Sequence, residues 1–200
     1  MVDNYVIILN GRPTAGKDTF VRLVKKYCDM FDYAWVSHIS SVNPIKEFLT
    51  DRLGWDGKKD DATRKLLADI KQYWDSRGGY TSVSYCIDEV LKHINAEATR
   101  KDDKIIFVDI REPYNIDKIV NALDALKDVY NIKTYTVFID RPQVAVDHGN
   151  ASDDNVENFV YDAVIFNNST INEFEKLAHE FVENLFKGGF DDGTDGNTGN

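Results

Sequence analysis

The sequence has few cysteines, a shortage of basic side chains and no long apolar run. Because no apolar stretch is long enough to cross a bilayer, we expect a soluble protein. Cys28 and Cys86 lie far apart, and neither has a second cysteine or a histidine at metal-ligand spacing, so we expect two buried, reduced thiols. The formal net charge of −10 and a pI near 4.8 disfavour binding to DNA, RNA or an anionic membrane.

An export signal is also missing. No N-terminal stretch combines basic residues, an apolar core and a small-residue cleavage site, so we expect a cytoplasmic protein. The length of 200 residues suits one α/β domain with a full-sized core. With no internal repeat, we predict a single domain over residues 1–187.

Short apolar runs alternate with segments of helical character. This alternation is typical of a parallel sheet with helices on both faces, and we predict a three-layer α/β/α fold around a five-stranded parallel sheet. The expected strands are 5–9, 33–39, 105–108, 134–139 and 163–166. The expected helices are about 17–30, 43–54, 61–76, 82–99, 113–128 and 170–186, with Pro113 in a first helical turn and Thr170 as an N-cap.

A loop containing glycine and lysine follows the first apolar run directly, and residues 11–19 read GRPTAGKDT. Glycine lets backbone N–H groups turn inward around a polyphosphate, and a helix beginning at Lys17 points its positive dipole end at the anion. The Lys17 ammonium would reach the outer phosphates. The alternative is a plain glycine turn with a solvated Lys17. We predict a phosphate loop that binds ATP through Gly11, Thr14, Ala15, Gly16, Lys17, Asp18 and Thr19.

Two carboxylates are candidates for holding the Mg²⁺ that accompanies such a nucleotide. Asp18 stands directly after Lys17, where a magnesium-binding Ser or Thr is usual, and the hydroxyl comes one place later at Thr19, so the ion would be held through water. Asp109 ends an apolar strand, a layout in which an acidic side chain orients Mg²⁺ beside the phosphate loop. Arg111 would project from the same edge and suits phosphate oxygens; its alternative is a surface ion pair with Glu112 or Asp109.

Residues 40–100 form a long helical insertion between the second and third expected strands. It combines basic and aromatic side chains, which suits an acceptor nucleotide because a base stacks on an aromatic platform and a phosphate needs a cation. Aspartates nearly balance the charge, so we expect Lys46 and Arg64 to touch ligand and Trp74 to contribute the platform. The remaining basic residues are interpreted as solvated helix faces: Arg52, Lys65, Lys71 and Arg77.

Two segments are expected to lack regular structure. Residues 141–160 open with Arg141 and form a candidate lid over the phosphates. Within this lid we interpret His148 as a surface histidine. Residues 188–200 are acidic and rich in glycine with almost nothing apolar, so we expect a disordered tail.

The order of several short motifs resembles the deoxynucleoside monophosphate kinases of bacteriophages over residues 5–185. The motifs are Gly-Lys-Asp-Thr at 16–19, Asn-Pro-Ile-Lys at 43–46, Gly-Trp-Asp-Gly at 54–57 and Asp-Ile-Arg-Glu-Pro-Tyr-Asn at 109–115. Residues 162–168 and the helix after them are similar to the last strand region of nucleoside monophosphate kinases generally.

The resemblance implies a P-loop kinase with core, acceptor-binding and lid parts, encoded by a phage and working in the host cytoplasm as a monomer or homodimer. It would transfer the γ-phosphoryl group of ATP, with Mg²⁺, to a deoxynucleoside monophosphate. Lys17, Asp109 and Arg111 would be catalytic, with Arg111 on the acceptor or transferring phosphate and Arg141 on adenine or phosphate. Because residues 142–160 contain no arginine or lysine, either Arg12, Arg64 and Arg111 supply the missing charge or turnover is slow.

Two other functions stay open. The animal-type phosphomevalonate kinases also resemble the chain in the Gly-Lys-Asp loop and the Asp-x-Arg element, and their acceptor carries no base. An acceptor pocket with aromatic walls would favour a nucleotide, and a wholly basic one would favour this rival. The scant basic lid is compatible with a nucleotide-binding module without turnover. No Asn-Lys-x-Asp segment is present, which argues against a signalling GTPase.

Overall fold

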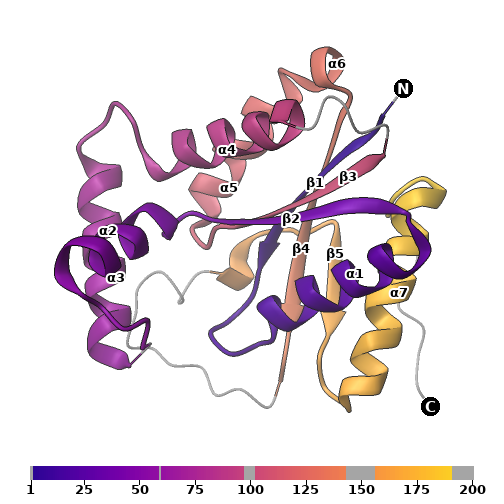
Figure 1. The fold of residues 1–200 in the computed structure, drawn as a ribbon, viewed down its shortest axis with the longest axis horizontal. Helices are drawn as coiled ribbons and strands as arrows, with labels where there is room; N and C mark the ends of the chain where they lie inside the picture. Colours follow the sequence, from indigo (N-terminus) through magenta and orange to yellow (C-terminus); the bar gives the residue numbers. More distant parts are fainter. Residues whose placement is uncertain (1, 59, 97–101, 143–155, 191–200) are drawn as a thin grey trace.

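Five parallel strands form one sheet through the middle of the computed structural model, which describes residues 2–58, 60–96, 102–142 and 156–190 (Figure 1). The strand order is β2-β3-β1-β4-β5. All four strand pairs are parallel, as predicted. The bounds are β1 (Asn4–Asn10), β2 (Ala34–Ser40), β3 (Asp103–Asp109), β4 (Ile132–Asp140) and β5 (Ala163–Phe166).

Helices cover both faces of the sheet and complete the predicted three-layer α/β/α fold. All seven residues of the central strand β1 are buried, which explains its unbroken apolar run. Tyr5, Ile7 and Leu9 pack with α1 (Lys17–Phe31) and α7 (Ile171–Lys187). Val6 and Ile8 point to the other face, which is covered by α4 (Ser82–Ala96) and α5 (Pro113–Asp124).

The first part of the long insertion forms a separate small helical unit. Helices α2 (Asn43–Leu53) and α3 (Asp61–Ser76) pack on each other through Ile45, Leu49 and Leu67, at one end of the sheet (Figure 1). Helix α4 instead packs on the sheet through its own apolar side chains. The insertion predicted over 40–100 therefore divides into an outlying helix pair and one core helix.

Most element bounds follow the prediction, and one helix does not. Pro113 begins α5 as expected, and the Thr170 hydroxyl caps α7 by accepting a hydrogen bond from the Glu173 N–H at 3.3 Å. The helix predicted over 113–128 ends at Asp124, and a four-residue helix, α6 (Lys127–Tyr130), follows. The break lets Leu126 and Tyr130 pack on the α4/α5 face of the sheet.

Both cysteines are buried free thiols, as predicted.

The described chain continues past residue 187 to Phe190, whose ring packs against Phe181 and Tyr135. The rest of the tail, residues 191–200, lies outside the described residues, as do 97–99 of the predicted fourth helix and 143–155 of the lid, including His148. A short 3-10 helix, η1 (Val156–Asn158), lies within the segment predicted as a lid. Within the described part, no helix is long and apolar enough to span a membrane.

Candidate functional site

The loop between β1 and α1 adopts backbone conformations that favour glycine. Gly11 has φ +147° and Gly16 has φ +105°. A Cβ at Gly11 would lie 2.6 Å from the Ile139 carbonyl oxygen, and one at Gly16 would lie 2.6 Å from Nδ2 of Asn167. Thr14 also has a positive φ, +63°, although it carries a side chain. The loop is therefore tightly curved and closely packed from outside, as the motif predicts.

Lys17 lies at the first position of α1 and folds back across the loop. Its Nζ donates hydrogen bonds to the main-chain oxygens of Gly11 at 2.6 Å and Arg12 at 3.2 Å. Arg141, after β4, reaches the same loop and donates to the Thr14 oxygen at 3.4 Å. The loop, the start of α1 and two cations thus form one surface suited to phosphate oxygens.

Contacts of two asparagines that the sequence did not reveal hold this loop in place. Asn167, just after β5, donates from Nδ2 to the Ala15 oxygen at 2.8 Å. Asn10 ends β1; its Oδ1 accepts from the Gly11 N–H at 2.8 Å, and its Nδ2 donates to the Arg111 oxygen at 3.0 Å. Asn10 therefore ties the base of the loop to the chain segment that carries Arg111.

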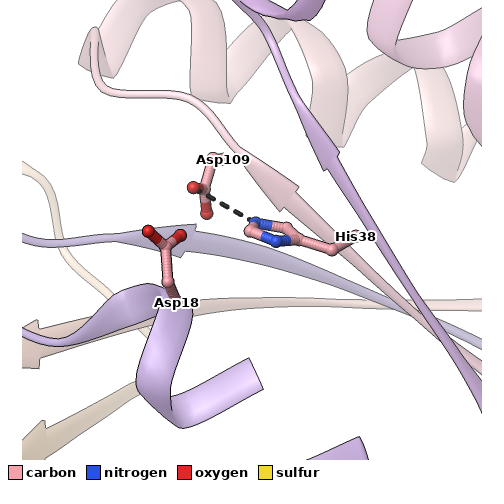
Figure 2. Close-up of side chains that lie close together, drawn as sticks. All are labelled: Asp18, His38 and Asp109. Atoms are coloured by element: carbon pink, nitrogen blue, oxygen red, sulfur yellow. Dashed lines mark ion pairs between the residues drawn. The ribbon is translucent and has the colours of Figure 1, made fainter. Parts of the chain in front are cut away.

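Three side chains with metal-ligand atoms meet beside the loop, as Figure 2 shows. Asp18 comes from the first turn of α1, His38 from β2 and Asp109 from the end of β3, and one ligand atom of each lies within 4.8 Å of the others. The strand pairing explains why His38 and Asp109 meet, because β2 lies beside β3 and Ser40, two residues after His38, lies opposite Asp109. Asp18 and Asp109 were predicted metal candidates; His38 was not recognised.

The environment of this cluster fits a divalent cation. Burial lowers the pKa of His38, but the hydrogen bond and negative charge of Asp109, with a contribution from Asp18, outweigh it, so the pKa is raised above 6.5. The Oδ1 atom of Asp109 is buried and has no hydrogen-bond partner among the residues that the structure describes. An acceptor of this kind is available for a cation or a metal-bound water.

The cluster and the phosphate loop open into one cleft of about 750 Å³. Its described lining contains six cationic side chains and three carboxylates, although the chain as a whole is strongly acidic. A local excess of positive charge in an acidic protein indicates an anionic ligand. The cations are Lys17, Lys46, Arg64, Lys71, Arg111 and Arg141, and the carboxylates are Asp18, Asp109 and Glu112.

The cleft brings together most of the residues that the sequence singled out. Thr14, Gly16, Lys17, Asp18, Thr19, Lys46, Arg64, Asp109, Arg111 and Arg141 line it. Gly11 and Ala15 shape the loop from behind. The Arg12 side chain lies outside the described cleft lining and forms an ion pair with Glu157 of η1. Trp74 is also outside the lining: it packs with the α2–α3 core and donates from Nε1 to the Tyr80 oxygen at 2.7 Å.

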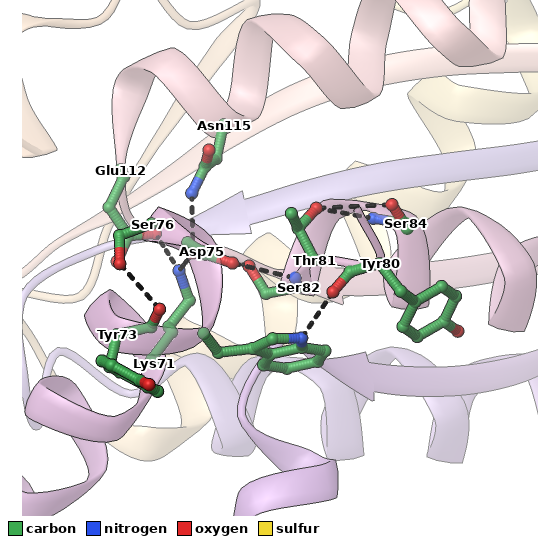
Figure 3. A network of polar contacts seen from close by, with 11 residues as sticks. Lys71, Tyr73, Asp75, Ser76, Tyr80, Thr81, Ser82, Ser84, Glu112 and Asn115 are labelled. Carbon is green, nitrogen blue, oxygen red and sulfur yellow. Dashed lines mark hydrogen bonds and ion pairs between the residues drawn. The ribbon is translucent and has the colours of Figure 1, made fainter. Parts of the chain in front are cut away.

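Lys71 is a cleft residue that the sequence interpretation placed wrongly on a solvated helix face. It is only 5% exposed and forms ion pairs of 2.8 Å with both Asp75 and Glu112 (Figure 3). Asp75 also accepts hydrogen bonds from the Ser82 N–H and hydroxyl, each at 2.9 Å. This network joins α3 to α4 and to the start of α5. The two carboxylates compensate the buried ammonium, which explains why Lys71 can be buried at all.

These features define the class of protein. A parallel α/β/α fold with a glycine-shaped loop between its central strand and the first helix, and with a lysine at that helix start, is the P-loop NTPase fold.

Comparisons with known proteins found no matching family model and no matching curated protein. Among solved structures, the APS kinase of Mycobacterium tuberculosis with AMPPNP and APS is 13% identical, with a TM-score of 0.46 and 92% and 99% of the two chains covered. The thymidylate kinase of Ehrlichia chaffeensis is 16% identical, with a TM-score of 0.42 and 90% and 99% covered. The shikimate kinase of Aquifex aeolicus is 18% identical, with a TM-score of 0.41 and 93% and 99% covered.

Proposed function

We propose that this protein is a kinase that transfers the γ-phosphoryl group of ATP to the phosphate of a small acceptor, with a (deoxy)nucleoside monophosphate as the first candidate. The observation that carries the proposal is the single cleft in which the phosphate loop and Lys17 share walls with Lys46, Arg64 and Arg111. A binding site for ATP alone has no need of cations on the helical insertion. Two phosphate-bearing ligands in one cleft account both for Lys17 with the phosphate loop and for the further cations Lys46, Arg64 and Arg111.

The proposed reaction needs positioning and charge more than proton transfer. An oxygen of the acceptor phosphate attacks the γ-phosphorus, the bond to the β–γ bridging oxygen breaks, and its electron pair leaves with ADP. Lys17 and the N–H groups of the loop would hold the donor phosphates. Arg111 would hold the acceptor or the transferring phosphoryl group. Mg²⁺, held by Asp18 and Asp109, supplies charge neutralisation at the phosphate oxygens when bound.

One observation favours a second acceptor class. Among the described residues that line the cleft, the only Phe, Tyr or Trp is Phe174, which lies against the phosphate loop near Gly16. The aromatic side chains of the insertion, Tyr73, Trp74 and Tyr80, do not line it. A basic acceptor wall without an aromatic platform suits a phosphorylated acceptor that carries no base, as in the phosphomevalonate kinases.

The deciding experiment is an ADP-release assay with Mg²⁺-ATP and one acceptor at a time. The acceptors are the four deoxynucleoside monophosphates, their ribose counterparts and phosphomevalonate. Turnover with a nucleotide supports the first acceptor class, and turnover with phosphomevalonate alone supports the second. ATP binding with no turnover on any acceptor would instead favour a nucleotide-binding module and contradict the kinase proposal.

A further inference from the structure

We propose that Asp18, His38 and Asp109 form a divalent-metal site that binds its ion without nucleotide and prefers a transition ion such as Mn²⁺ or Co²⁺ to Mg²⁺. The role of this ion in phosphoryl transfer rests on the proposed function. Its binding to the protein does not, because the three ligands come from the chain itself (Figure 2).

The distances between the ligand atoms suit one ion. Nε2 of His38 and Oδ2 of Asp109 are 3.2 Å apart. Neighbouring ligands of a six-coordinate ion with bonds of about 2.1 Å lie about 3 Å apart, so an ion can replace the proton that these two atoms share. One oxygen of the Asp18 carboxylate lies within 4.8 Å of a ligand atom of each of the other two residues, and rotation of the exposed Asp18 side chain can close that remaining distance.

His38 and Asp109 are held in place before any ion arrives. His38 and Asp109 lie on neighbouring strands in a fixed register, and the Ser41 N–H donates to the Asp109 main-chain oxygen at 3.0 Å. Asp109 accepts the contact from His38 through Oδ2, while its buried Oδ1 has no hydrogen-bond partner in the described part of the chain. This carboxylate is therefore oriented by its strand and still has an acceptor atom to offer.

The imidazole is the ligand that sets the preference. Mg²⁺ favours oxygen ligands and usually reaches kinase sites with the substrate phosphates and several waters. Imidazole nitrogen binds first-row transition ions better, following their general order of affinity. Lys46 lies near enough to influence His38 electrostatically, and its positive charge opposes binding, so we expect moderate affinity.

The test measures Mn²⁺ binding to the full-length protein with no nucleotide present. Electron paramagnetic resonance of free Mn²⁺ gives the stoichiometry and Kd, and electron spin-echo modulation detects a bound imidazole ¹⁴N nucleus. We expect one site with a clear ¹⁴N signal and at least tenfold weaker binding of Mg²⁺ in competition. His38→Gln should remove the ¹⁴N signal and weaken Mn²⁺ binding at least tenfold, and Asp109→Asn should weaken it at least as much.

The matched control is His179→Gln. His179 also pairs with a carboxylate, that of Glu175 at 3.9 Å, but it lies on α7 and stacks on Tyr27, outside the cleft lining. This variant should bind Mn²⁺ like the wild type. Circular dichroism of each variant verifies that it is folded. Absence of Mn²⁺ binding without nucleotide, or binding that survives His38→Gln unchanged, would overturn the proposal. Neither result bears on ADP release, so this inference and the kinase proposal can fail separately.

Discussion

The amide of Asn167 occupies the space that a side chain at position 16 would need. A Cβ on Gly16 would lie 2.6 Å from Asn167 Nδ2, and the same nitrogen donates to the Ala15 oxygen at 2.8 Å. The last strand of the sheet therefore holds the phosphate loop from outside, and the loop's shape depends on a residue about 150 positions further along the chain.

This contact predicts that Asn167→Ala loosens the loop. The Ala15 oxygen loses its partner, and the N–H groups that face the phosphates lose their fixed direction, so we expect ATP affinity to fall about tenfold with a loss of about 1 kcal/mol in stability. Isothermal calorimetry with ATP and urea unfolding measure the two effects. Asn95→Ala is the control, because that amide also donates to a main-chain oxygen, that of Leu91, but at an exposed position of α4. Equal ATP affinity in both variants would contradict the prediction.

Lys17→Ala should abolish turnover and leave the fold intact. The ammonium contributes charge at the phosphates and does not pack in the core, so we expect kcat to fall at least about 10²-fold with little change in Tm. Lys25→Ala, on the exposed face of the same helix where Lys25 pairs with Asp29, should behave like the wild type. Unchanged turnover in Lys17→Ala would refute the proposed mechanism.

Arg64→Gln should affect the acceptor and spare ATP. Arg64 lines the cleft from α3, and its ion pair with a described residue, exposed Asp61, is long at 3.7 Å, so it is available to an acceptor phosphate at small cost. We expect the acceptor KM to rise about tenfold while the KM for ATP stays within twofold. Arg52→Gln, at the exposed end of α2 and outside the cleft lining, is the comparison. A parallel rise in the KM for ATP would place Arg64 on the donor instead.

Asp75 should make part of the stability dependent on pH. Burial raises its pKa, but hydrogen bonds from Lys71 and Ser82 and the charge of Lys71 outweigh that effect, so the pKa lies below the ordinary 3.8. A carboxyl whose pKa is lower in the folded state than in the unfolded state stabilises the fold when the pH is above its unfolded-state pKa. This stabilisation is lost as the pH falls through its folded-state pKa. In urea unfolding, the difference in unfolding free energy between wild type and Asp75→Asn should stay constant from pH 5 to 8 and shrink below pH 4. A difference in unfolding free energy that grows as the pH falls would contradict the lowered pKa of Asp75.

The elements that could be predicted from sequence are those whose signal is local. Buried parallel strands produce apolar runs, and the run at 163–166 became β5 with the predicted bounds. The phosphate loop and the Thr170 cap are both signalled by neighbouring residues, so short motifs reveal them, although the contact of Asn167 with the loop has no such signal. The helix predicted through residue 128 failed because residues 125–127, Ala-Leu-Lys, have good helix propensity, and only packing against the sheet breaks it there.

The parts of the site that were missed depend on distant partners. His38 is an isolated histidine in a strand, and it meets Asp109 only because β2 pairs with β3 across the whole insertion. Lys71 has the sequence context of a solvated helix face, and only Asp75 and Glu112 together make its burial possible. Trp74 was taken as a base platform, but it is partly buried and packs against the core of the helix pair. No short pattern distinguishes these cases.

The position of β1 has a consequence for the newly made chain. Of the five strands in the described sheet, the central one is made first, and its partners come much later: Asn4 pairs with Lys104 and with Ile132. Until β3 and β4 have emerged, seven consecutive residues that the finished protein buries have no sheet to join. We expect a nascent chain of this protein to depend on chaperones during synthesis, and fragments that stop before β4 to aggregate.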